Sequence, residues 1–426
     1  MKTKICVIGA GLGGLSAGIR LANKGFEVDL YEQNSTPGGK AGEIKEMGYR
    51  FDTGPSLLTM PQVIKDLFSE CGENIDDYLS INRLELICKY FYPDGSIINA
   101  YSDQDKFGKE IDEKTSDNSA SLDKYLTYCK TIYELAGDLF LTKDPSSVST
   151  YLNSKALKTL LNVGKIDPFR TINEANESFF KDQRLVQLFN RYATYNGSNP
   201  YLAPATLNII PHVEYNQGSF IPVGGIYSIS RALNKLAEKK RVNIFLNQKV
   251  DEIILENREV KAIKVNDKII KYDKIISNVD VNFTFKNLIK NFNSRESRRY
   301  EKKLPSFSGL VFYWGIKKEF PELETHNILF SKNYKKEFDD LFENKTIHND
   351  PTVYIYISSK LNKDDAPSEK ENWFVMVNAP HIQNQNWENE IKTARKNVVK
   401  KINNFLNTDI ESLIEFEKIM SPVDIQ

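Results

Sequence analysis

Ile8-Gly-Ala-Gly-Leu-Gly-Gly14 contains the spacing G-x-G-x-x-G and stands between two regular patterns. The apolar run Lys4–Ile8 predicts a buried strand, and residues 12–24 predict a helix that ends at Gly25. The alternating segment Glu27–Tyr31 then predicts a second strand. A strand, a glycine-rich turn, a helix and another strand together indicate a βαβ unit with a parallel sheet.

The glycines of this turn have separate physical roles. Gly9 allows the tight turn, Gly11 leaves the backbone open to a pyrophosphate, and Gly14 lets the helix pack closely on the sheet. The helix that starts at Leu12 and Gly13 offers free N–H groups and the positive end of its dipole to the phosphates. The stretch therefore predicts a dinucleotide site.

An acidic residue occupies the position that distinguishes one dinucleotide from another. Glu32, followed by Gln33, comes directly after the second predicted strand. Its carboxylate can accept hydrogen bonds from the adenosine ribose hydroxyls and would repel a 2′-phosphate. The pattern favours FAD or NAD over NADP. The alternative, an ordinary glycine-rich turn, is disfavoured because the strand, the helix and the acid are in register.

Two further segments bring a family resemblance. Residues 37–42 read PGGKAG, and residues 49–56 read YRFDTGPS. A GG-[RK]-A segment followed by F-D-x-G-P-S resembles the carotenoid (phytoene-type) desaturases, which belong to the glutathione-reductase-like flavoproteins together with amine oxidases and protoporphyrinogen oxidase. NAD dehydrogenases lack the second glycine pair, so the resemblance implies FAD.

The resemblance runs from Lys4 to about residue 420. It includes FIPVGGI at 220–226, NQKV at 247–250 and ISNVD at 276–280. CKYFYPDG at 88–95 and IIPH at 209–212 resemble the hydroxycarotenoid 3,4-desaturase branch more than the phytoene branch. The motif and the resemblance together imply the following cofactor-binding residues: Gly9, Gly11, Leu12, Gly13, Gly14, Glu32, Gln33, Gly39, Lys40, Ala41, Gly54, Pro55, Ser56, Val250 and Asn278. The resemblance places Val250 against the adenine.

The glycine distribution predicts the domain organisation. Half of the 22 glycines lie at or before Gly54, glycines then become rare, and the α/β alternation returns near Gly218. We expect an α/β fold in which a Rossmann-like, glutathione-reductase-like FAD-binding domain is interrupted by a mixed α+β substrate domain. Residues 1–75 and 219–300 would form the FAD-binding domain. Residues 76–218 and 301–426 would form the substrate and membrane-facing domain.

Local patterns predict the elements between these parts. A hairpin is expected over residues 90–101 with its turn at Asp94-Gly95, and amphipathic helices over 121–140 and 178–192. The polar residues 109–119 predict an exposed loop. Residues 227–240 predict a helix, 242–246 a strand, 250–272 a three-stranded meander, and Lys274–Ser277 a short buried strand.

The chain departs from the family pattern at two places. Lys40 stands where relatives often carry arginine. Lysine keeps the positive charge but lacks the two parallel N–H donors with which arginine binds an anion. Family members end with another glycine-rich segment that closes over the flavin ring, whereas no glycine follows Gly315 here. We therefore expect that the family's C-terminal flavin segment is missing and that the sequence is truncated.

Composition excludes several classes of function. Lys plus Arg and Asp plus Glu are equal at 57, which removes the electrostatic argument for nucleic-acid binding. The four cysteines and four histidines form no metal-binding spacing, so we expect no metal and reduced thiols. No run approaches the ~20 apolar residues of a membrane span. We expect a cytoplasmic protein that associates peripherally with the inner face of the membrane.

The resemblance implies FAD-dependent desaturation of a long isoprenoid in carotenoid biosynthesis, by hydride transfer to flavin, with oxygen or a quinone as electron acceptor. Alternatives are another flavin oxidase of the amine-oxidase type, a carotenoid saturase or isomerase, and a lipid-binding protein on the same fold. No catalytic residue is identified. His212 is one candidate base, and a helix-end histidine is the alternative. Aromatic runs at 192–195 and 311–314 predict either a substrate tunnel or ordinary core packing.

Overall fold

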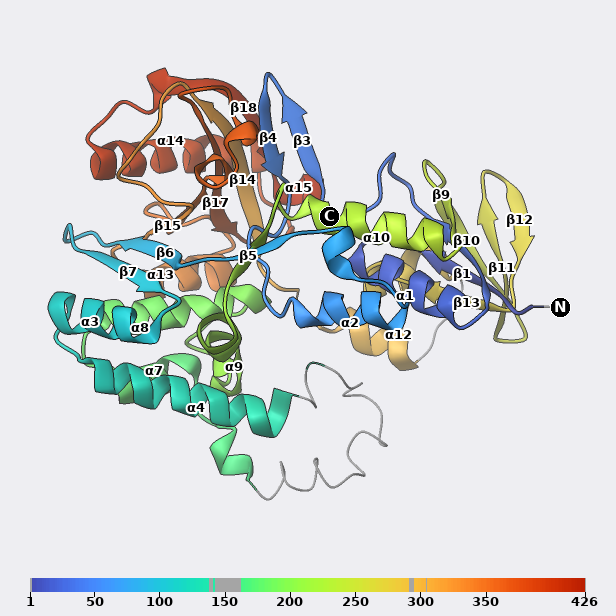
Figure 1. Cartoon of the computed structure of the whole chain (residues 1–426), viewed down its shortest axis with the longest axis horizontal. Helices are drawn as coiled ribbons and strands as arrows, with labels where there is room; N and C mark the ends of the chain where they lie inside the picture. The colour runs from blue at the N-terminus through green and yellow to red at the C-terminus, as the bar shows by residue number, and fades with distance from the viewer. Residues whose placement is uncertain (1, 138–140, 142–161, 291–294, 304, 426) are drawn as a thin grey trace. The chain divides into compact units, whose positions relative to one another are not determined.

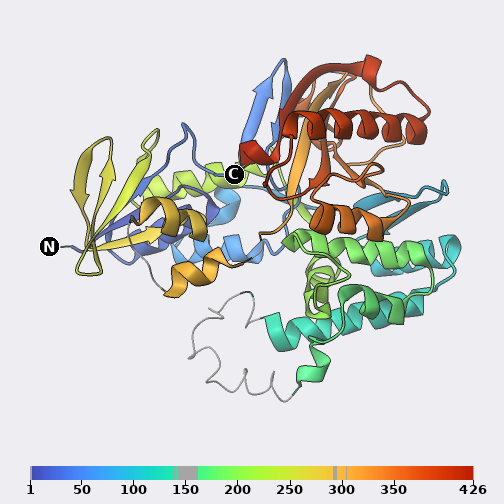
Figure 2. The same cartoon turned by 180° about the vertical axis from the view of Figure 1, so that it is seen from behind.

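The computed structural model of the chain describes residues 2–137, 141, 162–290, 295–303 and 305–425 (Figures 1 and 2). Contacts divide it into two compact units. Unit 1 comprises residues 1–45, 52–82 and 220–304, and unit 2 comprises residues 46–51, 83–219 and 305–426. The chain passes between the units near β3 (Glu43–Glu46), β4 (Tyr49–Asp52) and β5 (Ile81–Arg83).

Unit 1 is built on a four-stranded parallel sheet in the order β13-β1-β2-β9. Its strands are β1 (Lys4–Ile8), β2 (Glu27–Tyr31), β9 (Asn243–Phe245) and β13 (Lys274–Ser277). Helices α1 (Leu12–Asn23) and α10 (Tyr227–Lys239) contact each other and share one buried core with the sheet, in which Val7, Leu15, Leu30 and Leu233 meet. The predicted βαβ opening is confirmed.

The predicted meander of unit 1 is an antiparallel sheet of β10 (Val250–Glu256), β11 (Glu259–Val265) and β12 (Lys268–Lys271). Its turns contain the pairs Asn257-Arg258 and Asn266-Asp267, each with positive φ. Two consecutive positive φ angles are the geometry of tight hairpin turns. The other elements of unit 1 are α2 (Gln62–Glu70), η1 (Ile75–Asp77), β8 (Phe220–Pro222), α11 (Val281–Phe283), η7 (Thr284–Leu288) and α12 (Arg295–Glu301).

Unit 2 contains a seven-stranded sheet in the order β18-β14-β17-β16-β15-β6-β7. Every pairing is antiparallel except that of β15 with β6. Its strands are β6 (Leu86–Phe91), β7 (Ile97–Tyr101), β14 (Ser308–Ile316), β15 (His326–Leu329), β16 (Val353–Tyr356), β17 (Glu371–Ala379) and β18 (Ile414–Met420). The confirmed hairpin of β6 and β7 turns at residues 92–96.

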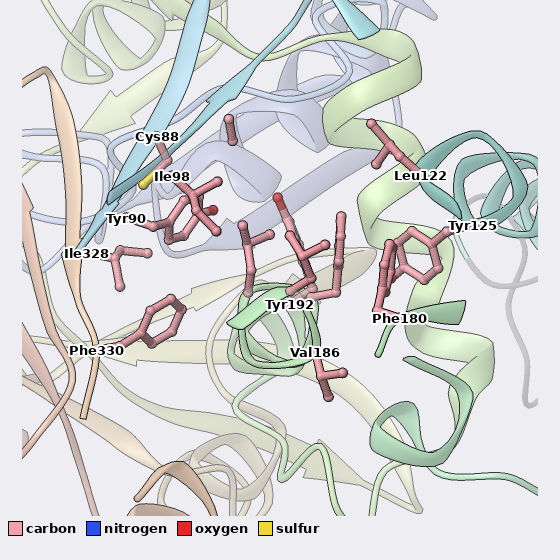
Figure 3. Packing of buried hydrophobic residues seen from close by; sticks show 14 of the residues in the cluster. Cys88, Tyr90, Ile98, Leu122, Tyr125, Phe180, Val186, Tyr192, Ile328 and Phe330 are labelled. Carbon is pink, nitrogen blue, oxygen red and sulfur yellow. The ribbon is translucent and has the colours of Figure 1, made fainter. Parts of the chain in front are cut away.

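Two cores cover the two faces of this sheet. Side chains alternate along a strand, so Phe91 and Leu329 face one core while Tyr90 and Ile328 face the other. Helix α14 (Trp387–Leu406) packs on the first core. The second core, shown in Figure 3, is closed by α3 (Gln104–Lys114), α4 (Ser119–Gly137) and α8 (Gln183–Asn190).

The remaining elements of unit 2 are mostly short. They are η3 (Val163–Lys165), α7 (Ile172–Phe179), η4 (Arg191–Asn196), η5 (Ala205–Asn208), α9 (Ile209–Pro211), η6 (His212–Gln217), α13 (Tyr334–Asp339), η8 (Asp340–Asn344), η9 (Ser358–Lys360), η10 (Lys363–Asp365), η11 (Glu411–Leu413) and α15 (Pro422–Ile425).

One local prediction in unit 2 was wrong, and another differs from the structure in its bounds. The loop expected over residues 109–119 is largely the helix α3, because Phe107 and Ile111 are four residues apart and bury one helical face beneath a polar majority. The helix expected over 178–192 is present as α8 but begins later, because Asp182 accepts the Arg184 N–H as its N-cap and the preceding helix α7 ends at Phe179. Residues 138–140 of the predicted helix 121–140 lie outside the described residues.

Candidate functional site

The glycine-rich turn of unit 1 leaves the start of α1 open. Gly9 has φ of +93° and donates its N–H to the Tyr31 carbonyl at 2.8 Å. Gly11 is the N-cap of α1, where no side chain caps the helix and no acidic residue occupies the first turn. Gly13 is exposed. The first N–H groups of α1 and the positive end of its dipole are therefore available to an anion.

Two glycines of the turn are required for different reasons. A Cβ on Gly14 would lie 1.9 Å from the Gly9 carbonyl oxygen, so the helix could not approach the strand. A Cβ on Gly11 would meet only the Asn278 amide nitrogen, at 3.4 Å, which is an ordinary contact. Protein packing therefore does not require glycine at position 11. The open space beside Gly11 fits a group that approaches the backbone, as a dinucleotide pyrophosphate does.

Glu32 is fixed beside this turn. Its side chain lies at the end of β2, is buried, and accepts the Ala10 N–H at 2.8 Å and the Asn34 N–H at 2.9 Å. The Asn34 side-chain amide donates to the same carboxylate at 2.8 Å. Among the residues that the structure describes, no lysine or arginine forms an ion pair with Glu32. A carboxylate has about four acceptor sites, so Glu32 can accept a further hydrogen bond. Gln33 is exposed.

The second glycine segment lies against the first. Gly38 donates its N–H to the Ala10 carbonyl at 2.8 Å and forms an isolated parallel bridge with Gly11. Gly39 has φ of +59° and lies so near that its Cβ would be 3.2 Å from the Gly11 Cα. Ala41 is buried. The structure therefore brings together the two glycine segments that the sequence singled out.

The F-D-T-G-P-S segment joins the same cluster. A Cβ on Gly54 would lie 2.1 Å from the carbonyl oxygen of Lys40, so residues 40 and 54 have closely packed backbones. The side chain of Lys40 is exposed, as is Pro55, and Ser56 is half-buried. Three segments separated in sequence thus meet at one place in unit 1.

Asp52 is a structural member of this site that the sequence interpretation missed. Its side chain is buried, and one carboxylate oxygen accepts the Tyr227 N–H at 3.0 Å, at the first residue of α10. An acceptor at a helix N-terminus satisfies a free donor and favours the helix dipole. The acidic residue of the F-D-x-G pattern was the signal that could have identified it.

The two remaining predicted residues differ in their surroundings. Asn278 follows β13, and its N–H donates to the Ile8 carbonyl at 2.8 Å. Its amide lies over the start of α1, because a Cβ on Gly13 would be 2.6 Å from the Asn278 Oδ1. Val250 is buried in a core cluster that also contains Ile8 and Tyr31. The structure therefore places Asn278 at the glycine turn and the Val250 side chain in the adjoining core.

His212, the candidate base, is accounted for by packing in unit 2. It is buried, its Nδ1 lies 2.6 Å from the Asn216 amide nitrogen, and its ring centroid is 4.6 Å from that of Tyr133. Burial lowers the pKa of this imidazole.

The aromatic run at 311–314 is buried along β14 and forms part of the hydrophobic core. Within the described ranges, no group of three or more His, Cys, Asp or Glu residues could hold a metal ion.

Comparisons with known proteins agree with this geometry. Residues 12–308 match the family model described as flavin containing amine oxidoreductase. The chain is 40% identical to a 1-hydroxycarotenoid 3,4-desaturase of Flavobacterium sp. (strain P99-3), over 99% of this chain and 86% of that protein. It is 33% identical to a 4,4'-diaponeurosporene oxygenase of Staphylococcus haemolyticus (strain JCSC1435), over 100% of this chain and 85% of the relative.

Solved structures show the same fold. An oxidoreductase from Methanosarcina mazei matches with a TM-score of 0.65 at 16% identity, over 98% of this chain and 87% of the other. A putrescine oxidase triple mutant matches with a TM-score of 0.65 at 10% identity, over 99% of this chain and 84% of the other. The predicted fold class, the predicted flavin cofactor and the predicted resemblance are confirmed. The chain therefore belongs to the flavin containing amine oxidoreductases and, within them, to the carotenoid desaturase family.

Proposed function

We propose that this protein is an FAD-dependent desaturase that introduces a double bond into a long, hydroxylated carotenoid. The observation that carries the proposal is the open glycine turn beside Glu32, in a chain that is 40% identical to a 1-hydroxycarotenoid 3,4-desaturase. Electrons would pass on to oxygen or a quinone. In this proposal unit 1 holds the cofactor and unit 2 holds the substrate.

The site residues have distinct roles in this proposal. The backbone at Gly9, Gly11, Leu12, Gly13 and Gly14 holds the pyrophosphate, because the N–H groups at the start of α1 have no side-chain cap. Glu32 accepts hydrogen bonds from the ribose hydroxyls. The other predicted contacts are Gln33 and Val250 toward the adenosine, and Gly39, Lys40, Ala41, Gly54, Pro55, Ser56 and Asn278 along the rest of the cofactor.

The chemistry explains why a flavin is needed. The C–H bonds of a CH2–CH2 unit are not acidic, so a side-chain base alone cannot start their oxidation. Bound FAD would accept a hydride from one carbon, a base would take the proton that the neighbouring carbon loses, and the protein supplies binding, orientation and the exclusion of bulk water.

Product analysis tests the proposed reaction against its nearest rival. The relatives include both a desaturase and oxygenases, and the higher identity is to the desaturase. With a hydroxylated carotenoid we expect a product two hydrogen atoms lighter, with its absorption moved to longer wavelength. A product that gains oxygen would show oxygenation instead. An isomer or a hydrogenated product would show an isomerase or saturase, and bound but unchanged substrate would show a binding protein.

Replacing Glu32 with glutamine should weaken FAD binding by about 1–3 kcal/mol, or roughly 5- to 150-fold in Kd. Glutamine keeps the shape but loses the charge and one acceptor oxygen. Fluorescence titration of the apoprotein with FAD measures the effect. The control is Glu27→Gln, at the exposed beginning of the same strand, where affinity should not change. Equal affinity in the wild type and Glu32→Gln would exclude the ribose role.

We also propose a peripheral contact with membranes. The part of the chain that the structure describes has no helix long and apolar enough to cross a bilayer. Phe169 and Leu202 are 86% and 74% exposed, and they precede Thr171 and Pro204, which form a bridge in unit 2. The bridge joins the two segments that carry these side chains, and large exposed apolar side chains are suited to insert between lipids.

Charged substitutions test this surface. We expect the double variant Phe169→Asp and Leu202→Asp to float with liposomes at least about fivefold less than the wild type, because each carboxylate opposes insertion into an apolar phase. The control, Met47→Asp, changes a surface residue that is 64% exposed in a turn elsewhere in unit 2. Unchanged flotation of the double variant would refute the assignment of this surface.

A further inference from the structure

Unit 2 contains a buried ion pair surrounded by tyrosines. The Arg191 Nη2 lies 3.4 Å from the Glu214 carboxylate and donates to the Tyr90 hydroxyl at 2.9 Å. The Tyr192 hydroxyl donates to Glu214 at 2.6 Å, and the Tyr195 hydroxyl donates to its other oxygen. The Arg191 guanidinium stands 4.3 Å from the ring centroid of Tyr192. Figure 3 shows Tyr90 and Tyr192 in the same cluster of buried side chains.

Two buried polar atoms near this pair, Arg191 Nε and His326 Nε2, have no hydrogen-bond partner among the described residues, and the Tyr215 hydroxyl has the Tyr192 hydroxyl beside it. A buried donor or acceptor without a partner costs about 1–3 kcal/mol, and such groups are rare in folded proteins. The two unpaired atoms beside one ion pair therefore point to a ligand that supplies the missing partners.

His326 faces the same cluster from the sheet. Ile328 pairs with Tyr90 across β15 and β6, and side chains two residues apart share a face, so His326 lies on the Tyr90 face. Burial, together with the Arg191 charge, lowers the pKa of His326 to about 3. The imidazole is neutral at physiological pH, and its Nδ1 pairs with the Tyr354 hydroxyl at 2.7 Å, which leaves Nε2 for another group.

The backbone that carries the cluster is irregular. Arg191 begins a 3-10 helix at the end of α8, and Glu214 and Tyr215 lie in a π-helical turn. Such turns aim side chains in directions that a regular α-helix does not allow, and they occur often at functional sites. Tyr195 is 45% exposed, so the cluster reaches the surface of unit 2 through its contact with Glu214.

We propose that Arg191, Tyr215 and His326 bind the hydroxyl group of a hydroxylated isoprenoid substrate. The charges of Arg191 and Glu214 cancel, so a neutral ligand leaves no uncompensated buried charge, whereas a carboxylate or phosphate would. A hydroxyl both donates and accepts, which suits an Arg N–H, a tyrosine hydroxyl and a neutral imidazole nitrogen together. A hydrocarbon would leave Arg191 Nε and His326 Nε2 unpaired, so the cluster would select oxygenated substrates.

The inference rests on the proposed function, and binding separates the two. Holoprotein in detergent micelles is titrated with a hydroxylated carotenoid and with the hydrocarbon of equal length, using quenching of tryptophan fluorescence. We expect Tyr215→Phe to weaken binding of the hydroxylated compound about five- to tenfold and to leave hydrocarbon binding unchanged. The variant removes a hydroxyl whose neighbour, the Tyr192 hydroxyl, still donates to Glu214, so its Tm should fall by no more than a few degrees.

A matched variant and a second site variant complete the test. Tyr125→Phe removes a hydroxyl of the same core whose partner is Asn208, and should not alter the preference between the compounds. His326→Phe keeps a ring stacked on Tyr356 and should reduce the preference as Tyr215→Phe does. Equal wild-type binding of both compounds, or a preference retained in both site variants, would overturn the inference. A preference without desaturation would support the site and refute the proposed function.

Discussion

Gly11→Ala should produce a folded protein that purifies without FAD. The new Cβ meets only the Asn278 amide nitrogen at 3.4 Å, so the apoprotein fold tolerates it. The same methyl group occupies the space through which the pyrophosphate approaches the backbone. We expect FAD affinity to fall at least about 100-fold, or ~2.7 kcal/mol. The ratio of flavin to protein absorbance and the far-ultraviolet circular dichroism spectrum measure cofactor loss and folding separately.

A glycine outside the turn provides the control for Gly11→Ala. Gly164 lies in unit 2, and a Cβ there meets nothing within 4 Å. Gly164→Ala should therefore retain its full flavin content. A yellow Gly11→Ala protein with wild-type FAD affinity would show that the pyrophosphate does not pass position 11.

Gly14→Ala should destabilise the fold of unit 1 and not only prevent FAD from binding to it. Its Cβ would lie 1.9 Å from the backbone oxygen of Gly9, and neither atom belongs to a flexible side chain. Relief of this overlap requires α1 to move away from β1, which opens the core around Leu15. We expect a loss of at least about 3 kcal/mol in the free energy of unfolding, although alanine is otherwise favoured over glycine in a helix by about 1 kcal/mol.

Gly18 in the same helix supplies the comparison for Gly14→Ala. A Cβ at Gly18 would make ordinary contacts of 3.6 Å with Leu30 and Val242. Gly18→Ala should therefore be neutral or stabilising by up to about 1 kcal/mol in urea unfolding. If the two alanine variants are equally stable, the close packing of α1 on β1 is not what requires Gly14.

The sequence predicted the parts of the molecule in which the pattern is local. The βαβ opening follows from a strand, a turn and a helix within residues 4–31, and the meander follows from alternation around Asn257 and Asn266. The glycine segments could be assigned to one site because their backbone requirement appears in the residue type itself. These signals depend on neighbours in sequence.

Other features depend on contacts between distant residues and could not be predicted. The order of the seven-stranded sheet places β15 beside β6, which is more than two hundred residues earlier in the chain. The overlap between Asn278 and the Gly13 position joins opposite ends of unit 1 in sequence. The ion pair of Arg191 and Glu214 is formed by irregular helices whose geometry no periodicity predicts. The helix α3 was missed because polar residues outnumber its few buried side chains.

An anaerobic single turnover tests the proposed function most directly. Oxidised holoprotein is mixed with a hydroxylated carotenoid without oxygen or quinone, and the flavin absorbance and the mass of the product are recorded together. We predict that the oxidised-flavin absorbance disappears while a product two hydrogen atoms lighter forms in an amount equal to the flavin. Product that forms while the flavin stays oxidised, or a purified protein that takes up no FAD, would contradict the proposal.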